Sequence, residues 1–382
     1  MKCISSSTNG ISTHFFFDSI NFVHYQAFQL FSLAKPPIMK LYRLLFTGFV
    51  IIQSLYIQAQ SHDIDKEQFF LDEKPIEATM VTDLNRLMSG KSKTEYLDAT
   101  LTCKLPDSAA FTEGIRIRAR GEFRRKTCYI PSLRLNFHNA SSPRLSSLDA
   151  LKLVCTCKTG TTYEQYLLKE YIIYKIYNLL TPKSFRVRLI KMNYQDIQGK
   201  KKSMSQYAFF IENIKVMAKR NHCKEYTKDK VTTEGTNRNQ MTMVAVFQYM
   251  IGNTDWAVPV LHNIRLIYPK DDSTARPYVV AYDFDFSGLV NTDYAIPAPG
   301  LTEIESVRQR LYRGFPRTMG ELQTVFTVYK EQKEKIYAVI NNFNLLSAAN
   351  RKDIIGYLDE FYRTIDNESD VQTVFIDNAR KE

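Results

Sequence analysis

The sequence predicts an α+β fold of two lobes, an antiparallel sheet lobe followed by a mainly helical lobe. The 382 residues suffice for two such units, each with its own core. Short segments in the first half alternate apolar and polar residues, which is typical of half-buried strands. Longer segments in the second half have helical periodicity. We expect the sheet lobe over residues 61–212 and the helical lobe, with the catalytic loops, over 213–382.

Residues 39–60 have the pattern of a signal peptide. A short basic start precedes an apolar run from Leu44 to Ile57, and small residues follow. The run is short for a membrane span of about twenty residues, so we expect cleavage; an uncleaved anchor is the alternative. We expect residues 1–38 to be an upstream extension foreign to the natural protein. The chain is therefore predicted to be exported, to the periplasm, cell envelope or medium, and to meet a membrane only through this segment.

The net charge of +11 favours anionic partners, although basic residues are spread along the chain. No array of basic and aromatic residues resembles a nucleic-acid-binding module. We therefore expect no nucleic-acid partner.

The cysteines allow two interpretations. Export would let Cys128 pair with a cysteine of the Cys155-Thr-Cys157 motif. The alternative is a set of reduced, buried thiols.

The first half predicts a sheet with one packed helix. A long helix is expected over 163–180, because Pro182 then stops it. A short helix and one strand are expected before residue 110. The other predicted strands are 115–120, 132–137, 150–155, 185–190 and 206–211.

The second half predicts helices around one hairpin. Residues 213–239 are polar and are expected to form a connector. The hairpin strands are expected at 263–268 and 278–282. The predicted helices are 240–250, 303–312, 319–333 and 348–361.

Four polar residues around this hairpin suggest phosphoryl transfer. Asp255 follows a buried helix and can accept the proton of an attacking hydroxyl. Asn263 opens the first hairpin strand, and its amide oxygen can ligate Mg²⁺. Asp283 or Asp285 follows the second strand and can bridge metal to phosphate. His262 is expected to be structural. The prediction requires these side chains to share one cleft, which demands a backbone turn at the Asp-x-Asp.

The sequence also resembles the spore-coat-type CotH family of atypical protein kinases. The resemblance covers just under half of the chain. It rests on residues 118–121, 132–137, 166–180, 207–212, 252–255, 262–263 and 283–285.

The resemblance implies a protein-kinase-like fold with ATP and Mg²⁺ (or Mn²⁺) as cofactors, and a protein or other surface hydroxyl as acceptor. It implies that Asp255 is the catalytic base and that Asn263 and the Asp-x-Asp hold the metal. Arg134 or Lys152 would take the place of the kinase strand lysine, and Glu170 would pair with it. Glu212 would border the cofactor.

Two departures from kinase patterns keep alternatives open. The loop between Asp255 and Asn263 is longer than in standard kinase catalytic loops and must bulge. A G-x-G-x-x-G phosphate loop is absent, and residues 120–123 stand at its place. A non-catalytic envelope or surface binding protein (a pseudokinase) and a metal-dependent hydrolase are therefore the alternative functions.

Overall fold

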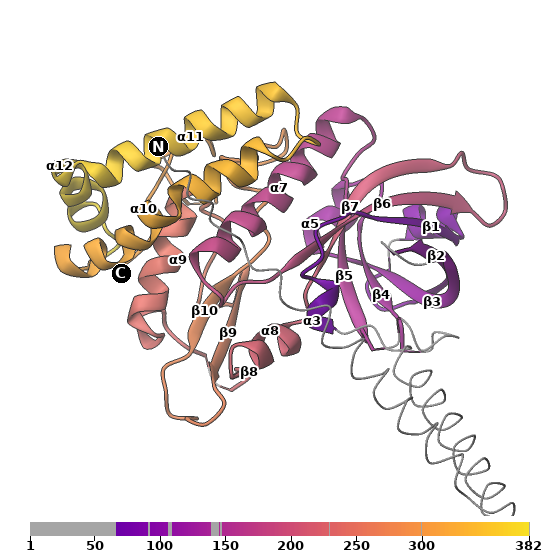
Figure 1. Cartoon of the computed structure of the whole chain (residues 1–382), viewed down its shortest axis with the longest axis horizontal. Helices are drawn as coiled ribbons and strands as arrows, with labels where there is room; N and C mark the ends of the chain where they lie inside the picture. Colours follow the sequence, from indigo (N-terminus) through magenta and orange to yellow (C-terminus); the bar gives the residue numbers. More distant parts are fainter. Residues whose placement is uncertain are drawn as a thin grey trace, which may run out of the picture. The chain divides into compact units, whose positions relative to one another are not determined.

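The computed structural model describes residues 66–90, 92–105, 109–138, 145, 147–228, 230–298 and 300–381 (Figure 1). All of them belong to one compact unit, Asp63–Glu382. The predicted extension (1–38) and signal peptide (39–60) lie outside the described residues. In the part that is described, no helix combines the length and the apolar composition needed to cross a bilayer.

Seven strands form a closed barrel (Figure 1). Neighbouring strands are antiparallel, except that β1 and β6 are parallel, with Ile76 opposite Ile190. This parallel pair closes the barrel. Around it the order is β1 (Ile76–Thr82), β2 (Leu97–Lys104), β3 (Phe111–Arg120), β4 (Ser132–Asn136), β5 (Ala150–Cys155), β7 (Met204–Ile211) and β6 (Val187–Asp196).

The prediction of a two-lobed, protein-kinase-like fold with an antiparallel sheet lobe is therefore wrong. Sequence periodicity predicts one strand before residue 110, whereas this segment forms β1, the helix α4 (Leu84–Gly90) and β2. The strand β1 pairs with both β2 and β6 and so joins the two edges of the expected sheet. Closure satisfies backbone groups that the edge strands of an open sheet leave unpaired.

Side-chain alternation explains the strands that the sequence predicted. In β3, Ile117 and Ala119 are buried while Arg118 and Arg120 between and after them are more exposed. Ile117 belongs to the barrel core together with Leu135 of β4. Because successive side chains point to opposite faces, the arginines of β3 lie on the outer surface of the barrel.

The helix α7 (Thr161–Leu180) connects the barrel to the helical region. It packs against β6 and β7 and against α10 (Met319–Asn341). Tyr174 and Tyr177 of α7 are fully buried, and the ring of Tyr177 stacks on Phe247 at 4.2 Å. The helix ends before Pro182, which confirms the predicted helix over 163–180.

The helical region contains a second, smaller sheet of order β10-β9-β8. The strands β9 (Ile264–Pro269) and β10 (Tyr278–Ala281) confirm the predicted hairpin. The expected connector 213–239 instead forms α8 (Ile214–Arg220), β8 (Cys223–Glu225) and a 3₁₀ turn (Thr233–Gly235). The remaining helices are α3 (Lys66–Phe69), α5 (Glu122–Thr127), α9 (Arg238–Met250), α11 (Ala348–Asp366), α12 (Glu368–Val371) and a π-helical turn (Gln372–Asp377).

The helix predicted over 303–312 does not form. Arginines of this segment instead bind backbone carbonyls elsewhere. Arg308 donates to the carbonyl oxygen of Gly288 at 3.0 Å, and Arg310 donates to that of Met250 at 3.4 Å. These tertiary hydrogen bonds satisfy carbonyls of other segments and hold 303–312 against them as a series of bends and turns.

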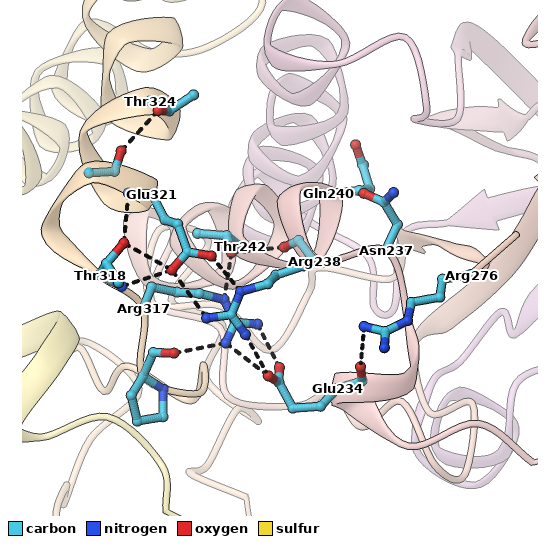
Figure 2. A network of polar contacts seen from close by, with 12 residues as sticks. Glu234, Asn237, Arg238, Gln240, Thr242, Arg276, Arg317, Thr318, Glu321 and Thr324 are labelled. Carbon is cyan, nitrogen blue, oxygen red and sulfur yellow. Dashed lines mark hydrogen bonds and ion pairs between the residues drawn. The ribbon is translucent and has the colours of Figure 1, made fainter.

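A network of ion pairs fastens the start of α9 to the start of α10 (Figure 2). Arg317 is 4% exposed and donates to both carboxylate oxygens of Glu234, at 2.6 and 3.1 Å. Its Nε donates to Thr242 at 2.8 Å. Arg238 pairs with Glu321, whose pKa falls to about 2, chiefly because of this hydrogen bond. The network fixes α9, from which the loop with Asp255 begins.

A disulfide joins Cys128, directly after α5, to Cys157, two residues beyond the end of β5. The first of the two interpretations of the cysteines is therefore confirmed, with Cys157 as the partner. Cys155 stays a buried thiol. The bond ties the short helix α5 to the end of the barrel.

Replacing Arg317 with methionine should lower the free energy of unfolding by about 2 kcal/mol, because Glu234 and Thr242 lose a buried charged donor. Arg276→Met is the matched control, since Arg276 is exposed and reaches the carbonyl oxygen of Glu234 at 3.4 Å only. Urea denaturation measures both. Equal losses in the two variants would show that the network does not fasten α9.

Candidate active site

Three segments from distant parts of the sequence line one cavity of about 320 Å³. They are the turn after β3, the loop after α9 and the segment after β10. The cavity contains Asp255, Asn263, Asp283 and Asp285. The side chains from which the sequence predicted a shared cleft therefore do lie in one cavity.

The loop after α9 begins with a turn that only glycine fits. Gly252 has φ +64°, and a Cβ atom there would lie 2.0 Å from the hydroxyl oxygen of Tyr357. The side chain of Asn253 then accepts a hydrogen bond from the backbone N–H of Asp255 at 3.0 Å. These contacts direct Asp255 into the cavity.

Both carboxylate oxygens of Asp255 are engaged. Oδ1 lies 2.6 Å from Nε2 of His262. Oδ2 accepts a hydrogen bond from Nδ2 of Asn263 at 2.9 Å, and the same nitrogen donates to the main-chain oxygen of Asp255 at 2.8 Å. Asn263 therefore acts through its nitrogen to hold Asp255. His262 was expected to be structural, but it is a direct partner of the candidate base.

A small backbone bridge explains how the long loop closes. Ala257 and His262 exchange both backbone hydrogen bonds, at 2.9 and 3.0 Å. Leu261 and Asn263, on either side of His262, have positive φ angles of 52° and 51°. Such backbone is unfavourable for residues other than glycine and is held in place by the surrounding structure. The sequence shows the extra length but not this closure.

The Asp-x-Asp turns at its first residue. Asp283 has φ 66°, and its backbone N–H donates to the hydroxyl of Tyr174 at 2.9 Å. Phe284 between the two aspartates is fully buried, 4.7 Å from the ring of Tyr174. Asp285 accepts a hydrogen bond from the hydroxyl of Tyr294 at 3.1 Å. Both carboxylates consequently face the same cavity.

Glu170, Asp283 and Asp285 form an acidic cluster, with carboxylate oxygens within 4.8 Å of one another. Burial raises the pKa of Glu170 to about 8, against the opposing charge of Arg124 and with a further rise from Asp285. Burial also raises the pKa of Asp285, and Arg124 again opposes it. Oε1 of Glu170 is buried and accepts no hydrogen bond from the described residues. Hard oxygen donors and one unsatisfied oxygen fit a divalent cation such as Mg²⁺.

Glu170 does not pair with Arg134 or Lys152, as the sequence suggested. Its Oε2 lies 2.9 Å from Nη2 of Arg124, which also lies 3.0 Å from Oδ2 of Asp285. Arg124 lies on α5, which is six residues long and follows β3 directly after Gly121. The disulfide and the end of the barrel bring this helix over α7, and no sequence pattern encodes that approach.

Four basic residues form a cationic cluster beside the acidic one. They are Arg120, Arg134, Lys152 and Arg265. Arg134 is the cross-strand neighbour of Lys152. Across the described residues, none of the four forms a salt bridge within 4.0 Å. Two of them contact the ring of Tyr282, with Lys152 at 4.6 Å and Arg265 at 5.2 Å from its centroid. Like charges opposite one another repel, so the cluster suits an anionic ligand.

The surroundings of Lys152 lower the pKa of its ammonium group. Lys152 is half-buried by surface area, but protein atoms enclose its ammonium group, and burial is the main cause that lowers its pKa to about 7. Arg120 and Arg265 lower the pKa further, while Asp283 raises it. An anion bound beside Lys152 would restore its charge.

A second cavity of about 600 Å³ adjoins the cationic cluster. Arg134, Lys152, Arg265 and Glu212 line it. Glu212 is buried, and Arg220 holds it with two hydrogen bonds of 2.9 Å. Its carboxylate therefore fixes the end of β7 at the wall of this cavity. The cationic groups of Lys152 and Arg265 lie over the ring of Tyr282, which lines the smaller cavity.

No model of a known protein family matches the chain, and no curated protein is significantly similar to it.

Gly252→Ala should lower the free energy of unfolding by more than about 2 kcal/mol, since the Cβ would overlap the hydroxyl of Tyr357 and the backbone is left-handed. Gly356→Ala is the control, because nothing lies within 4 Å of a Cβ there and α11 gains a better helix former. The control should stabilise by about 0.5 to 1 kcal/mol. Thermal unfolding measures both, and effects of the same sign would contradict the assigned turn.

Lys152 should make stability depend on pH. Its pKa of about 7 lies below the ordinary value of 10.5. The folded protein therefore loses stability as pH falls from about 10.5 toward about 7, where the unfolded chain binds a proton first. At pH 8 without ligand, Lys152→Met should be more stable than the native protein by about 1 to 2 kcal/mol.

Lys215→Met is the control for this comparison, because Lys215 lines the same cavity but is exposed. Urea denaturation between pH 7 and pH 10 gives the two profiles. If the free energy of unfolding of Lys152→Met depended on pH in the same way as that of the native protein, a lowered pKa of Lys152 would be refuted.

Proposed function

We propose that the chain is an exported enzyme that transfers a phosphoryl group from ATP to a hydroxyl group, with Mg²⁺ or Mn²⁺ as its metal. One observation supports the proposal: a cationic cluster that forms no salt bridge among the described residues lies beside an acidic cluster with an unsatisfied oxygen. Phosphoryl transfer from a nucleotide requires both, because the phosphates must be held and their charge neutralised.

The cationic cluster supports binding of the triphosphate. Lys152 and Arg265 line the larger cavity and lie over the ring of Tyr282, which lines the smaller one. Arg120 also lines the smaller cavity. A polyanion there would relieve the repulsion that lowers the pKa of Lys152. The cavity of about 600 Å³ beside it is within the ordinary range for a small-molecule ligand and suits the nucleoside.

The acidic cluster supports binding of the metal. Asp283, Asp285 and Oε1 of Glu170 would hold the ion, with Asn263 on the same cavity wall. Bound there, the ion would neutralise phosphate charge and orient the transferred group.

The position of the Asp255 carboxylate supports its role as the general base. Asn263 and His262 fix its carboxylate in the same cavity as Asp283 and Asp285. A base held in position can take the proton of an acceptor hydroxyl as the hydroxyl attacks. We propose that the acceptor is a protein or another hydroxyl-bearing molecule of the cell surface.

Different observations support the proposed chemistry and the proposed export. The resemblance to CotH-type kinases agrees with the roles proposed for Asp255 and the Asp-x-Asp, while the barrel fold by itself carries no function. The disulfide between Cys128 and Cys157 supports an oxidising compartment, which agrees with the proposed signal peptide.

Hydrolysis is a second candidate, favoured by one contact. The imidazole of His262 is half exposed and bound to Asp255, so the pair can also activate a water molecule. The same metal site would then serve a hydrolase. A protein that binds the nucleotide without turnover is the remaining alternative.

Incubation of the purified chain with γ-labelled ATP and Mg²⁺ or Mn²⁺, in the presence of cell-envelope extract, separates these functions. We expect labelled acceptor from the native protein and a loss of at least about 100-fold in Asp255→Asn. ATP should still raise the melting temperature of that variant, because the cationic cluster, and not Asp255, is proposed to bind the triphosphate.

Asp271→Asn is the matched control, because Asp271 is exposed in the turn between β9 and β10. It should transfer label at the native rate. Release of free phosphate alone would favour the hydrolase, and nucleotide binding without turnover would favour a binding protein. Failure to bind ATP at millimolar concentration would reject the proposal.

A further inference from the structure

Arg124 places a permanent positive charge inside the acidic cluster. It is buried, with Nη2 at 2.9 Å from Glu170 and 3.0 Å from Asp285. Its Nη1 donates to the carbonyl oxygen of Cys155 at 2.9 Å. Burial alone would lower the pKa of Arg124, but the neighbouring charges, led by that of Asp285, raise it well above its ordinary value.

The position of Arg124 does not depend on a bound metal. Its main-chain oxygen accepts a hydrogen bond from the backbone N–H of Cys128 at 3.0 Å. Cys128 is bonded to Cys157, and the carbonyl oxygen of Cys157 accepts from the backbone N–H of Tyr129 at 2.7 Å. The arginine is thus fastened by covalent and backbone contacts beside the cluster.

The charges then balance with a single divalent ion. A bound ion displaces the proton that Glu170 holds at its raised pKa. The three carboxylates then contribute three negative charges, and Arg124 contributes one positive charge. One divalent cation neutralises the remainder, and a second would leave buried positive charge without a partner. The phosphates of a nucleotide do not change this, because the cationic cluster already faces them.

Arg124 also reduces the number of free ligand atoms in the acidic cluster. Oδ2 of Asp285 is shared by Arg124 and the hydroxyl of Tyr294. Oε2 of Glu170 is taken by Arg124, which leaves Oε1. Among the described residues, no ion pair or side-chain hydrogen bond engages the carboxylate of Asp283.

We propose that Arg124 is a fixed cation of the metal centre, so that the acidic cluster holds one divalent ion where protein kinases hold two. Arg124 is thereby a positioning residue that takes the place of a second metal. The inference rests on the proposed function for the nucleotide, but the metal count can be measured without it.

The test counts Mn²⁺ bound to the full chain by electron paramagnetic resonance, with Mn²⁺ alone and with Mn²⁺ plus a non-hydrolysable ATP analogue. Ions absent from Asp283→Asn are assigned to the acidic cluster. We expect one such ion per chain in both conditions. We expect one in Arg124→Lys, which keeps the charge, and two in Arg124→Met with the analogue.

Arg125→Met is the control on the same helix, since Arg125 forms an ion pair with the exposed Glu122. It should bind one ion. If Arg124→Met does not fold, Arg124→Gln, which also removes the charge, takes its place with the same expected count of two.

Two cluster ions in the native protein, or one in a folded Arg124→Met, would overturn the role of Arg124 while leaving phosphoryl transfer intact. No cluster ion in any condition would overturn both. One ion with Mn²⁺ alone, together with no binding of the analogue, would support the single-metal centre and reject the proposed function.

Discussion

The site depends on the burial of one phenylalanine. Phe284 is fully buried against Tyr174 and Tyr177 of α7 and Phe247 of α9. Burial of a ring of this size contributes about 2 to 3 kcal/mol, which offsets the left-handed backbone at Asp283. Because Phe284 separates the two aspartates, its anchorage turns both carboxylates toward the cavity. The same contact joins α7, which carries Glu170, to α9, from which the loop with Asp255 begins.

The acidic cluster and the cationic cluster lie close to each other near Phe284, but their charges are not fully paired. The acidic cluster retains an unsatisfied oxygen on Glu170 although Arg124 is present. The cationic cluster contains Lys152, whose pKa is lowered mainly by burial and further by the charges of Arg120 and Arg265. Both features cost folding free energy, and neither is required by the packing of the barrel. Such costs are typical of sites arranged for a ligand that supplies the missing charge.

Much of the local structure could be predicted because it depends on neighbouring residues. Alternation over 115–120 and 150–155 indicated strands, and Pro182 marked the end of a helix. The strand that closes the barrel could not be predicted, since β1 pairs with residues more than a hundred positions away. The helix expected over 303–312 failed for a similar reason, because its arginines bind carbonyls of other segments.

The sequence alone determined which side chains have chemistry to offer and the order in which they occur. Asp255, Asn263 and the Asp-x-Asp were found from residue type, spacing and the hairpin between them. Only the tertiary structure decided their partners: His262 on Asp255, and Arg124 on Glu170 and Asp285. Residue type sets what a group can donate or accept, but its partner depends on which distant segments pack together, and that is a property of the whole folded chain.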